Sequence, residues 1–483
     1  MKKQCFNPYL PSWEYVPDGE PRVFGDRLYV YGSHDAFNGP DFCVNDYVLW
    51  SAPLDDLSDW RCDGVIYRAA QDPKNADGKM HMCAPDCVQG PDGRYYLYYQ
   101  LHVLTCTSVA VADSPIGPFE HYGYVQHPDG TPWGEKKGDS FAFDPGVLVD
   151  DDGRVYCYVG FAPEGFMRTV FKLRGNRVDE SVCLTLDKDM KTVIGGEKPI
   201  VPGPKKAKGT PYDGHAFFEA SSIRKIGKKY YYVYSSILSH ELCYAISDHP
   251  DRDFTFGGTI ISIGDIGWRG NTKPDNYLGN THGGMAEING QWYIFYHRQT
   301  NRQKCARQGC AERITLLPDG SIPQIETSSC GLNSGPLNGE GRYEARIACT
   351  LRSANGVFKY EHAHEKDKRQ LHPFFTQSGS DRENDGDQYI ANMRHGAEAG
   401  FRSFMMQGRT TLSVEVRGDG RGFLELRTDP EKEPVGKIPV LPSAEWRTSS
   451  MDGTLELVGE IALYFRFNGQ GAVDFQAFIL KKS

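Results

Sequence analysis

The sequence lacks several features that would place it in a large functional class. No apolar run in its 483 residues approaches the ~18 to 20 residues of a membrane-spanning helix. Positive charge is not in excess, since 54 Lys and Arg against 63 Asp and Glu give a formal charge of -9. Nucleic-acid and anionic-membrane binders need a basic surface, so we expect neither partner. The two lysines near Met1 precede no apolar segment of the kind found in a secretory signal, which predicts a cytoplasmic protein.

The cysteines also lack a recognisable pattern. There are 13 of them, an odd number, and none lies in the last hundred or so residues. The closest pairs, Cys83 with Cys87 and Cys305 with Cys310, do not have the CxxC spacing of a zinc or redox motif. We therefore expect reduced thiols that mostly pack in the core as small hydrophobic side chains.

Glycine, proline and aromatic residues are plentiful, with 53 Gly, 29 Pro and 12% aromatics, a mixture typical of short strands joined by tight turns. One phrase, a turn glycine followed by an aromatic-rich strand, occurs five times. The turn glycines lie roughly 60 to 75 residues apart, enough for a four-stranded antiparallel sheet each. A single sandwich would not give five equivalent hairpins at this spacing. The pattern predicts a five-bladed β-propeller over residues 1–325, with turn glycines Gly25, Gly93, Gly153, Gly227 and Gly290.

A second β domain is expected after the repeats stop. Residues 326–345 are rich in Gly, Pro and small residues and predict a linker. Beyond it, residues 411–416, 422–427 and 462–467 alternate apolar and polar side chains, as half-buried strands do. The predicted fold class is therefore all-β, with a five-bladed propeller followed by a jelly-roll-like β-sandwich over residues 346–483.

Matching positions of the five blades carry a candidate site. The inner strands of a propeller run along its central channel, so residues at equivalent positions converge at one end. Counting back roughly seven to nine residues from each turn glycine reaches Asp18, Asp86, Asp144, Glu219 and His282. Carboxylates crowded around one axis repel each other, so they indicate a metal, a cationic partner or acid/base chemistry. A solvated rim is the alternative, but the neighbours of these acids are mostly apolar or Pro.

Two acids in an aromatic-lined channel suit glycoside hydrolysis, in which one carboxylic acid protonates the leaving oxygen and a carboxylate activates water on the opposite face of the sugar. Glu219 is the better acid because Phe217 and Phe218 beside it would raise its pKa by desolvation. Asp18, next to a glycine, suits the base. Glu20 competes for that role, since strand alternation places it on the same face as Asp18.

The quoted residues carry a resemblance to a known family. The phrases Asn7-Pro8-Tyr9-Leu10-Pro11 with Pro17-Asp18, Phe143-Asp144-Pro145-Gly146-Val147, Glu219-Ala220-Ser221-Ser222-Ile223, His282-Gly283 and Tyr296-His297-Arg298 resemble the ordered motifs of family 43 glycoside hydrolases, inverting five-bladed propellers. The resemblance implies that Asp18 is the general base, that Asp144 orients the acid and sets its pKa, and that Glu219 is the general acid.

The same resemblance implies further roles. His282 matches a histidine that in many members binds calcium or another cation, largely through water, at the channel centre. Arg298 matches an arginine that reaches the sugar. We also expect Phe143 and Asp86 to bind substrate, although Asp86 could instead cap a turn. The sequence departs from the family at Met82-Cys83, where a bulky aromatic is usual, which leaves the shape of the sugar subsite open.

The second domain is similar, more weakly, to family 6 carbohydrate-binding modules, on residues 389–393, 446–448 and 473–478. Those modules bind glycan through exposed loop aromatics, a pair of which we do not identify here. The domain could instead brace the propeller or join copies of the chain into a homo-oligomer. The predicted function is an inverting exo-glycosidase that removes terminal arabinofuranose or xylose from oligosaccharides. A galactofuranosidase, a non-catalytic sugar-binding propeller and, last, a phosphorolytic propeller are the alternatives.

Overall fold

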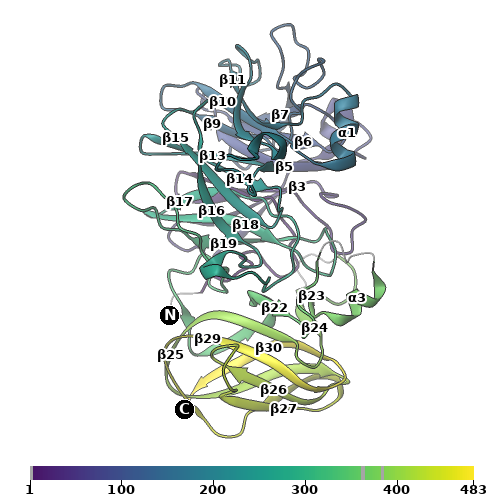
Figure 1. Ribbon diagram of the computed structural model, residues 1–483, viewed down its shortest axis with the longest axis vertical. Helices are drawn as coiled ribbons and strands as arrows, with labels where there is room; N and C mark the ends of the chain where they lie inside the picture. The colour runs from purple at the N-terminus through teal and green to yellow at the C-terminus, as the bar shows by residue number, and fades with distance from the viewer. Residues whose placement is uncertain (1–3, 360–364, 382–385) are drawn as a thin grey trace.

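Five small antiparallel sheets form the first two thirds of the chain, and a larger sheet forms the last third, below them in Figure 1. The computed structural model describes residues 4–359, 365–381 and 386–483. The predicted fold class, a five-bladed propeller followed by a second β domain, is confirmed. Within the described residues, no helix combines the length and apolar character needed to cross a membrane.

The first four blades have four strands each, and the fifth has three among the described residues. The strands of blade 1 are β1 (Glu20–Phe24), β2 (Arg27–Tyr31), β3 (Tyr47–Pro53) and β4 (Arg61–Tyr67); of blade 2, β5 (Met82–Gln89), β6 (Tyr95–Leu101), β7 (Thr107–Ala112) and β8 (Glu120–Tyr124); of blade 3, β9 (Gly146–Val149), β10 (Val155–Gly160), β11 (Glu180–Leu186) and β12 (Lys198–Pro202); of blade 4, β13 (Phe217–Ile226), β14 (Lys229–Ser236), β15 (Glu241–Ser247) and β16 (Thr255–Ser262); and of blade 5, β17 (Met285–Ile288), β18 (Gln291–Arg298) and β19 (Gln308–Arg313).

The five repeated phrases form the innermost hairpin of each blade, as predicted. The antiparallel pairs are β1 with β2, β5 with β6, β9 with β10, β13 with β14 and β17 with β18. All five turn glycines have a positive φ, between 61° and 83°, a conformation that costs glycine little and other residues more. The alternating aromatic side chains that follow them fill the space between neighbouring blades.

The N-terminal segment closes the propeller against blade 5. The backbone N–H of Tyr9 donates to the carbonyl of Gly309 in β19 at 3.2 Å. The side-chain amide of Asn7 donates to the Ala311 carbonyl at 3.0 Å and to Glu312 Oε1 at 2.7 Å. The two ends of the propeller are thus joined by hydrogen bonds, which fixes the ring of blades that shapes the channel.

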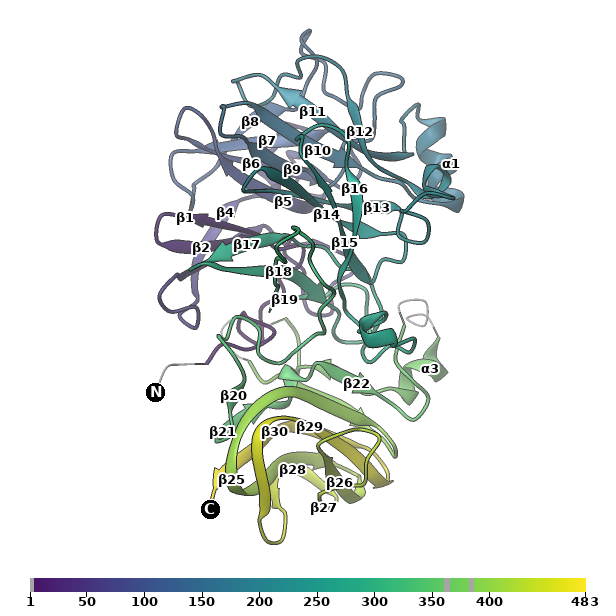
Figure 2. The same ribbon diagram turned by 60° about the vertical axis from the view of Figure 1, so that its left-hand side comes forward.

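Helices are few and short. The α-helices are α1 (Gly165–Leu173), α2 (Pro204–Ala207) and α3 (Lys366–Leu371), and the 3₁₀ turns are η1 (Ala69–Gln71), η2 (Pro73–Asn75), η3 (Trp268–Gly270) and η4 (Ala345–Ile347). In Figure 2, α1 lies at the side of the propeller, outside the blades.

The C-terminal domain wraps one hydrophobic core in a single strongly curved sheet with sandwich-like packing (Figure 2). Its central strands are long and pair with one another in register. The strands are β20 (Leu337–Asn338), β21 (Gly341–Glu344), β22 (Thr350–Arg352), β23 (Phe374–Thr376), β24 (Tyr389–Met393), β25 (Glu398–Gly418), β26 (Arg421–Arg427), β27 (Gly436–Val440), β28 (Ser443–Ser450), β29 (Leu455–Gln470) and β30 (Val473–Lys482).

The boundary between the domains differs from the predicted linker of residues 326–345. Strands β20 and β21 fall inside that range, and they pair with β25 and β30 of the second domain. On the other side, the N–H of Thr327 still donates to Asp265 of the propeller at 2.7 Å. The connection is therefore shorter than its Gly/Pro content suggested, because those residues make turns between strands rather than a flexible spacer.

The two domains share a polar interface. Arg402 of β25 forms an ion pair with the buried Asp265 of the propeller at 2.5 Å. The N–H of Leu351 donates to the carbonyl of Asp275 at 2.8 Å, and the side-chain amide of Asn276 donates to the carbonyl of Cys349 at 3.2 Å. These contacts position the second domain beside the end of the channel where the predicted site lies.

Candidate active site

The five inner strands place two layers of side chains across the channel. In the upper layer, Asp18, Ala84, Asp144 and Ala220 occupy equivalent positions, and all four have a positive φ between 39° and 70°. Non-glycine residues in this conformation are strained and often belong to functional sites. The lower layer lies two residues further along each strand. Strand alternation keeps both layers facing the channel axis.

The lower layer is filled by buried ion pairs. Arg22 holds Asp86 through two hydrogen bonds, of 2.9 and 2.6 Å. Arg224 lies 2.6 Å from Oε1 of Glu20, which also accepts a 2.9 Å hydrogen bond from Ser222. Blade 5 contributes Gly284, whose missing Cβ leaves the space that Glu20 and Ser222 occupy. The channel is therefore closed below the upper layer.

Two expectations are corrected by this layer. Asp86, expected to bind substrate, is absent from the cavity lining, and its carboxylate is bound by Arg22 and by the backbone N–H of Val147 at 2.7 Å. Glu20 faces the channel as predicted, but it lies beneath the cavity and against Arg224, so of the two candidates for the base only Asp18 lines the cavity. Ala84, two residues before Asp86, lines the cavity instead, together with its neighbour Cys83 on β5.

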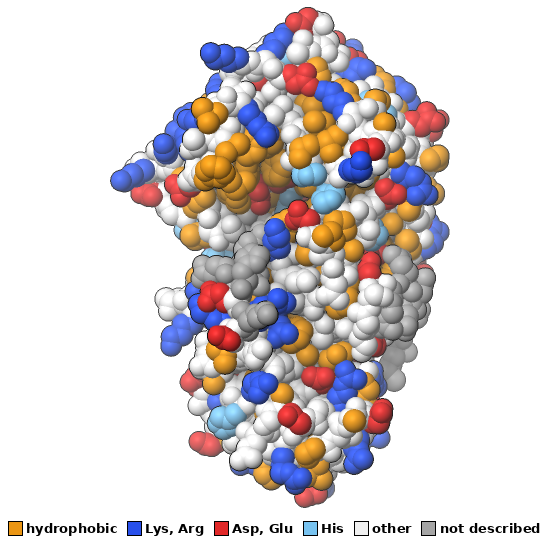
Figure 3. Space-filling model, turned by 90° about the vertical axis from the view of Figure 1, so that its right-hand side faces the viewer, with side chains coloured by type: hydrophobic (Ala, Val, Ile, Leu, Met, Phe, Trp, Pro, Cys, Tyr) orange, Lys and Arg blue, Asp and Glu red, His pale blue; other side chains and the backbone are white. Residues whose placement is uncertain are grey.

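Above the upper layer the channel opens into a cavity of about 720 Å³. Figure 3 shows the hollow on one face of the molecule, with hydrophobic side chains gathered at its rim and acidic and histidine side chains within and beside it. The cavity brings together the three predicted catalytic residues and His282. Its remaining lining includes the aromatic residues Phe42, Phe141, Phe143, Phe161, Phe171 and Phe218.

The aromatic wall comes from blades 3 and 4 and from α1. Phe143, predicted to bind substrate, lines the cavity and stacks on Phe141, with ring centroids 5.5 Å apart and planes 12° apart. Phe161 contacts both Phe143 and Phe218, at 5.0 and 5.4 Å between ring centroids. Such a wall presents flat apolar surface to the apolar face of a sugar ring and removes water from the carboxylates beside it.

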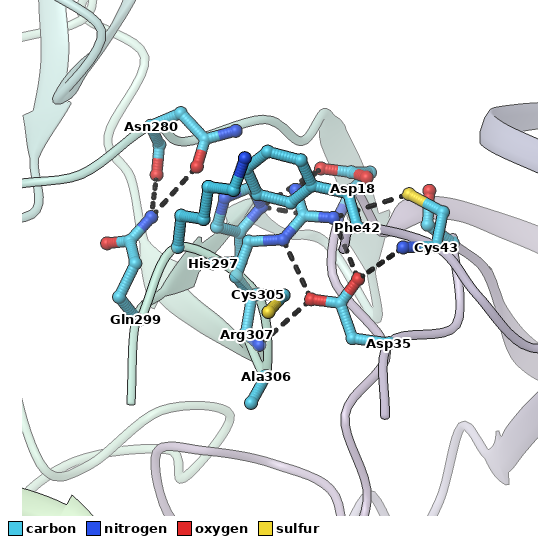
Figure 4. Close-up of polar contacts among 12 residues, drawn as sticks. Asp18, Asp35, Phe42, Cys43, Asn280, His297, Gln299, Cys305, Ala306 and Arg307 are labelled. Carbon is cyan, nitrogen blue, oxygen red and sulfur yellow. Dashed lines mark hydrogen bonds and ion pairs between the residues drawn. The ribbon is translucent and has the colours of Figure 1, made fainter. Parts of the chain in front are cut away.

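Asp18 is held as a carboxylate by Arg307. Nη1 of Arg307 lies 2.9 Å from Oδ1 of Asp18, while its other nitrogens bind Asp35 at 2.9 and 3.0 Å (Figure 4). His297 Nδ1 lies 3.2 Å from the same Asp18 oxygen. Burial alone would raise the pKa of Asp18, but the Arg307 guanidinium and His297 outweigh it and hold the pKa well below its usual range.

Glu219 has a raised pKa, in contrast to Asp18. Burial, together with the negative charge of Asp18, raises the pKa of Glu219 from 4.5 to about 8. The pKa of Asp144 is also raised, by burial and by the charges of Glu219 and Asp18, although the N–H of Ala220 donates to its Oδ2 at 3.0 Å. Carboxyl groups this close share protons. The cavity therefore holds an ionised Asp18 beside two carboxyl groups whose pKa values are raised by burial and by neighbouring negative charge.

His282 lines the cavity beside Asp144, with Nδ1 3.7 Å from Oδ2. Burial lowers its pKa to about 4, so the imidazole is neutral at pH 7. Calcium prefers six to eight oxygen ligands. Within the described part of the chain, no group of three His, Cys, Asp or Glu side chains converges at His282, so the residues do not fit a directly bound calcium ion. The calcium expectation remains a prediction, and no step below uses it.

Arg298, predicted to reach the sugar, lies elsewhere. Its guanidinium donates to the carbonyls of Ala348 and Arg346 at 2.9 and 2.6 Å and lies 3.9 Å from the centre of the Phe375 ring. It therefore joins β18 to the second domain and is absent from the cavity lining. The arginine in the cavity is Arg307, from the segment just before β19.

Two residues that contribute to the site, one beside the cavity and one in its lining, escaped the sequence reasoning. Asp35 follows the second strand of blade 1 and is not part of the repeated phrase, yet its carboxylate accepts hydrogen bonds from Arg307. Lys359 belongs to the second domain and also lines the cavity. The residue before it, Phe358, contacts the propeller, because its carbonyl accepts a hydrogen bond from the N–H of Leu278 at 3.3 Å. No pattern in the propeller repeats could have indicated a cavity residue supplied by the other domain.

The comparison with known proteins agrees with this geometry. The model of the family described as glycosyl hydrolases family 43 matches residues 16–322, which cover all five blades. The chain belongs to this family. It is therefore a glycoside hydrolase, and the alternative of a non-catalytic sugar-binding propeller is not favoured. The roles of the individual site residues remain predictions, now supported by where they lie.

Relatives extend the similarity beyond the propeller. A xylosidase/arabinosidase of Thermoclostridium stercorarium is 48% identical over 486 residues, which cover 99% of both chains. A family 43 enzyme of Xanthomonas citri, solved with xylose, covers 65% of this chain and 92% of its own, with a TM-score of 0.51 and 25% identity. A Bacillus subtilis arabinoxylan arabinofuranohydrolase covers 99% of this chain and 97% of its own, with a TM-score of 0.51 and 20% identity, which shows the two-domain fold alone.

Proposed function

We propose that the protein is an inverting exo-glycosidase that releases terminal arabinofuranose or xylose from short oligosaccharides. The observation that carries the proposal is the pair of carboxyl groups kept in opposite protonation states in one cavity. Arg307 keeps Asp18 ionised, and burial keeps Glu219 protonated near neutral pH. These are the states that a general base and a general acid need before the reaction starts.

The mechanism follows from these states. Asp18 accepts a proton from a water molecule, which attacks the anomeric carbon. Glu219 donates its proton to the glycosidic oxygen as the bond to the leaving group breaks. Asp144 is coupled to the acid, since the charge of Glu219 raises the pKa of Asp144, and its proposed role is to orient Glu219 and set its pKa. The apolar wall around Phe143 excludes water other than the nucleophile and places the sugar ring against the acids.

The closed channel supports exo action. The ion pairs of Arg22 with Asp86 and of Arg224 with Glu20 block the passage beneath the cavity. A polysaccharide chain cannot thread through it, so the cavity suits the end of a chain or a single-sugar branch. The sugar itself is proposed from the relatives, which carry xylosidase and arabinosidase names. Galactofuranose is the second candidate.

The test is hydrolysis of three aryl glycosides, an α-L-arabinofuranoside, a β-D-xyloside and a β-D-galactofuranoside. We expect turnover of the first two and none of the third. The anomer first released is then followed by NMR, and inversion is expected. Release with retention would contradict the assignment of Asp18 as a base that activates water. Turnover of the galactofuranoside alone would replace the proposed sugar.

The second domain is proposed to support the propeller. Tyr389 and Trp446, which the resemblance to binding modules singled out, contact each other at 5.3 Å between ring centroids, and Arg417 lies 4.3 Å from the Trp446 ring. These rings are engaged with neighbours of their own domain. The Arg298 contacts instead tie the domain to the propeller, and Lys359 of the domain lines the catalytic cavity. Failure of the isolated domain to bind xylo-oligosaccharides would agree with this role.

A further inference from the structure

Three side chains with metal-ligating atoms meet on blade 4, outside the catalytic cavity. They are His215, in the turn before β13, and Glu241 and Cys243 on β15. Glu241 and Cys243 are two residues apart on one strand, so their side chains share a face. One ligand atom from each residue lies within 4.8 Å of the other two. None of the three lines the cavity.

The separations suit a small tetrahedral ion. Nδ1 of His215 lies 2.7 Å from Oε1 of Glu241 and 3.9 Å from Sγ of Cys243, and Sγ lies 3.3 Å from the same oxygen. Tetrahedral Zn²⁺ with typical bond lengths places such ligand atoms roughly 3.3 to 3.6 Å apart. Adjustments of about half an ångström, within the reach of side-chain rotation, would therefore bring the three atoms around one ion.

The surroundings hold the ligands in place. The hydroxyl of Ser236 donates to Oε1 of Glu241 at 2.6 Å, and that of Thr259 donates to Oε2 at 3.0 Å. The His215 ring stacks on Phe256, with ring centroids 5.2 Å apart and planes 18° apart. Groups that orient metal ligands in this way raise metal affinity. The ligand positions are thus set by β14, β16 and a ring stack rather than by a mobile loop.

An ion could reach the cluster from solvent. The side chain of His215 is 36% exposed, whereas that of Glu241 is 4% exposed. Cys243 is buried beneath them. The thiol is therefore the most deeply buried of the three ligands, and the imidazole is the most exposed. A water molecule on the exposed side would be the fourth ligand of a tetrahedral ion.

We propose that His215, Glu241 and Cys243 form a binding site for a Zn²⁺-like transition metal ion. The ligand set of imidazole, carboxylate and thiolate selects such ions over calcium or magnesium, which prefer oxygen. Binding displaces the thiol proton of Cys243 to solvent, together with any proton on His215 Nδ1, because only the thiolate and the free nitrogen lone pair coordinate. No oxidation or reduction is involved.

The site would act on the catalytic cavity through short connections. His215 lies four residues before Glu219, the proposed acid. Glu241 follows His240, whose side chain lines the cavity. A metal ion would therefore tie the start of β13 to the start of β15, the two strand ends that frame this side of the cavity. We expect it to act as a structural clamp on blade 4 and not as a participant in hydrolysis.

The test uses the full-length protein, freed of metal by dialysis against a chelator and titrated with Co²⁺ as a coloured substitute for Zn²⁺. We expect one equivalent to bind with a near-ultraviolet thiolate-to-cobalt charge-transfer band, which added Zn²⁺ removes. Cys243→Ser should abolish the band, and His215→Gln, at the exposed rim, should weaken binding while leaving the fold intact. Thr259→Val should weaken it by about tenfold, as loss of an orienting hydrogen bond does.

The matched control is Cys330→Ser, which alters a half-buried thiol at the junction with the second domain, where its sulfur contacts the backbone of Arg402 and Ser403. It should keep the band and the affinity. Bound Zn²⁺ should also raise the thermal midpoint of wild type and of Cys330→Ser, but not of His215→Gln. Absence of the band in wild type, or its persistence in Cys243→Ser, would overturn the proposal, as would equal affinity in wild type and His215→Gln.

Discussion

Replacing Glu219 by Gln tests the proposed acid most directly. The rise of the Glu219 pKa from 4.5 to about 8 corresponds to up to roughly 5 kcal/mol of preference for the protonated form. An acid of this pKa is protonated below pH 8 and loses its proton above it, so wild-type kcat/KM should fall as pH rises through about 8. General acids contribute roughly 10²- to 10⁴-fold. We expect Glu219→Gln to lose about 10³-fold on a natural disaccharide.

Comparing substrates with different leaving groups distinguishes loss of the general acid from a folding defect. An aryl leaving group needs little protonation, so the same variant should keep much more of its activity on an aryl glycoside. Its remaining aryl activity should also be flat across pH 7 to 9, because the group that titrates near pH 8 has been removed. The assay is initial rate against pH for both substrates, with wild type measured beside the variant.

Glu312 supplies a matched control. It is a second buried glutamate, and burial raises its pKa to about 8 as well, but it hydrogen bonds to Ser328 and Tyr296 outside the cavity. Glu312→Gln should keep the alkaline fall near pH 8 and most of the activity. If Glu312→Gln abolished that fall, or if Glu219→Gln kept it, the fall would report loosening of the fold and the reasoning about the acid would be refuted.

Four further outcomes are expected. Asp18→Asn should lower kcat/KM by at least 10²-fold on both aryl and natural substrates, because activation of water does not depend on the leaving group; equal activity on either would remove Asp18 as the base. Asp86→Asn should lower the free energy of unfolding, measured by urea denaturation, by about 3 kcal/mol, because it leaves Arg22 buried without its partner charge, while kcat per folded molecule changes little. Lys359→Met should raise KM by about tenfold with kcat nearly unchanged if the lysine hydrogen bonds to substrate, and an unchanged KM would exclude that contact. Treatment with EDTA should alter kcat by less than about twofold, since among the residues that the structure describes no three ligating side chains converge at His282; a larger loss that calcium restores would establish an ion held there through water.

Local sequence patterns predicted the repeats and most of the candidate residues that line the cavity. Five turn glycines with aromatic strands behind them require five hairpins, because glycine adopts the turn conformation and alternation assigns the faces. Asp18, Asp144, Glu219 and His282 then follow from counting along equivalent strands, and all four line the cavity.

The count failed in blade 2 for a physical reason. The inner hairpins of blades 2 and 3 have longer turns, with β5 ending at Gln89 and β6 starting at Tyr95, whereas β1 and β2 are separated by two residues. The upper-layer position therefore lies nine residues before the turn glycine in blades 2 and 3, and seven in blades 1 and 4. Counting back seven residues from the turn glycine of blade 2 therefore reaches Asp86 in the lower layer instead of Ala84 in the upper layer.

The sequence by itself determined the periodic features of this protein: the number of blades, the hairpins, the channel-facing acids and the presence of a second β domain. Only the tertiary structure decided which charges pair. It assigned Asp86 to Arg22, Asp18 to Arg307 and Arg298 to the second domain, and it brought Lys359 from that domain to the cavity. Periodicity fixes which face of a strand a side chain occupies, but contacts between charges remote in the chain depend on loop lengths and domain packing, which carry no repeat.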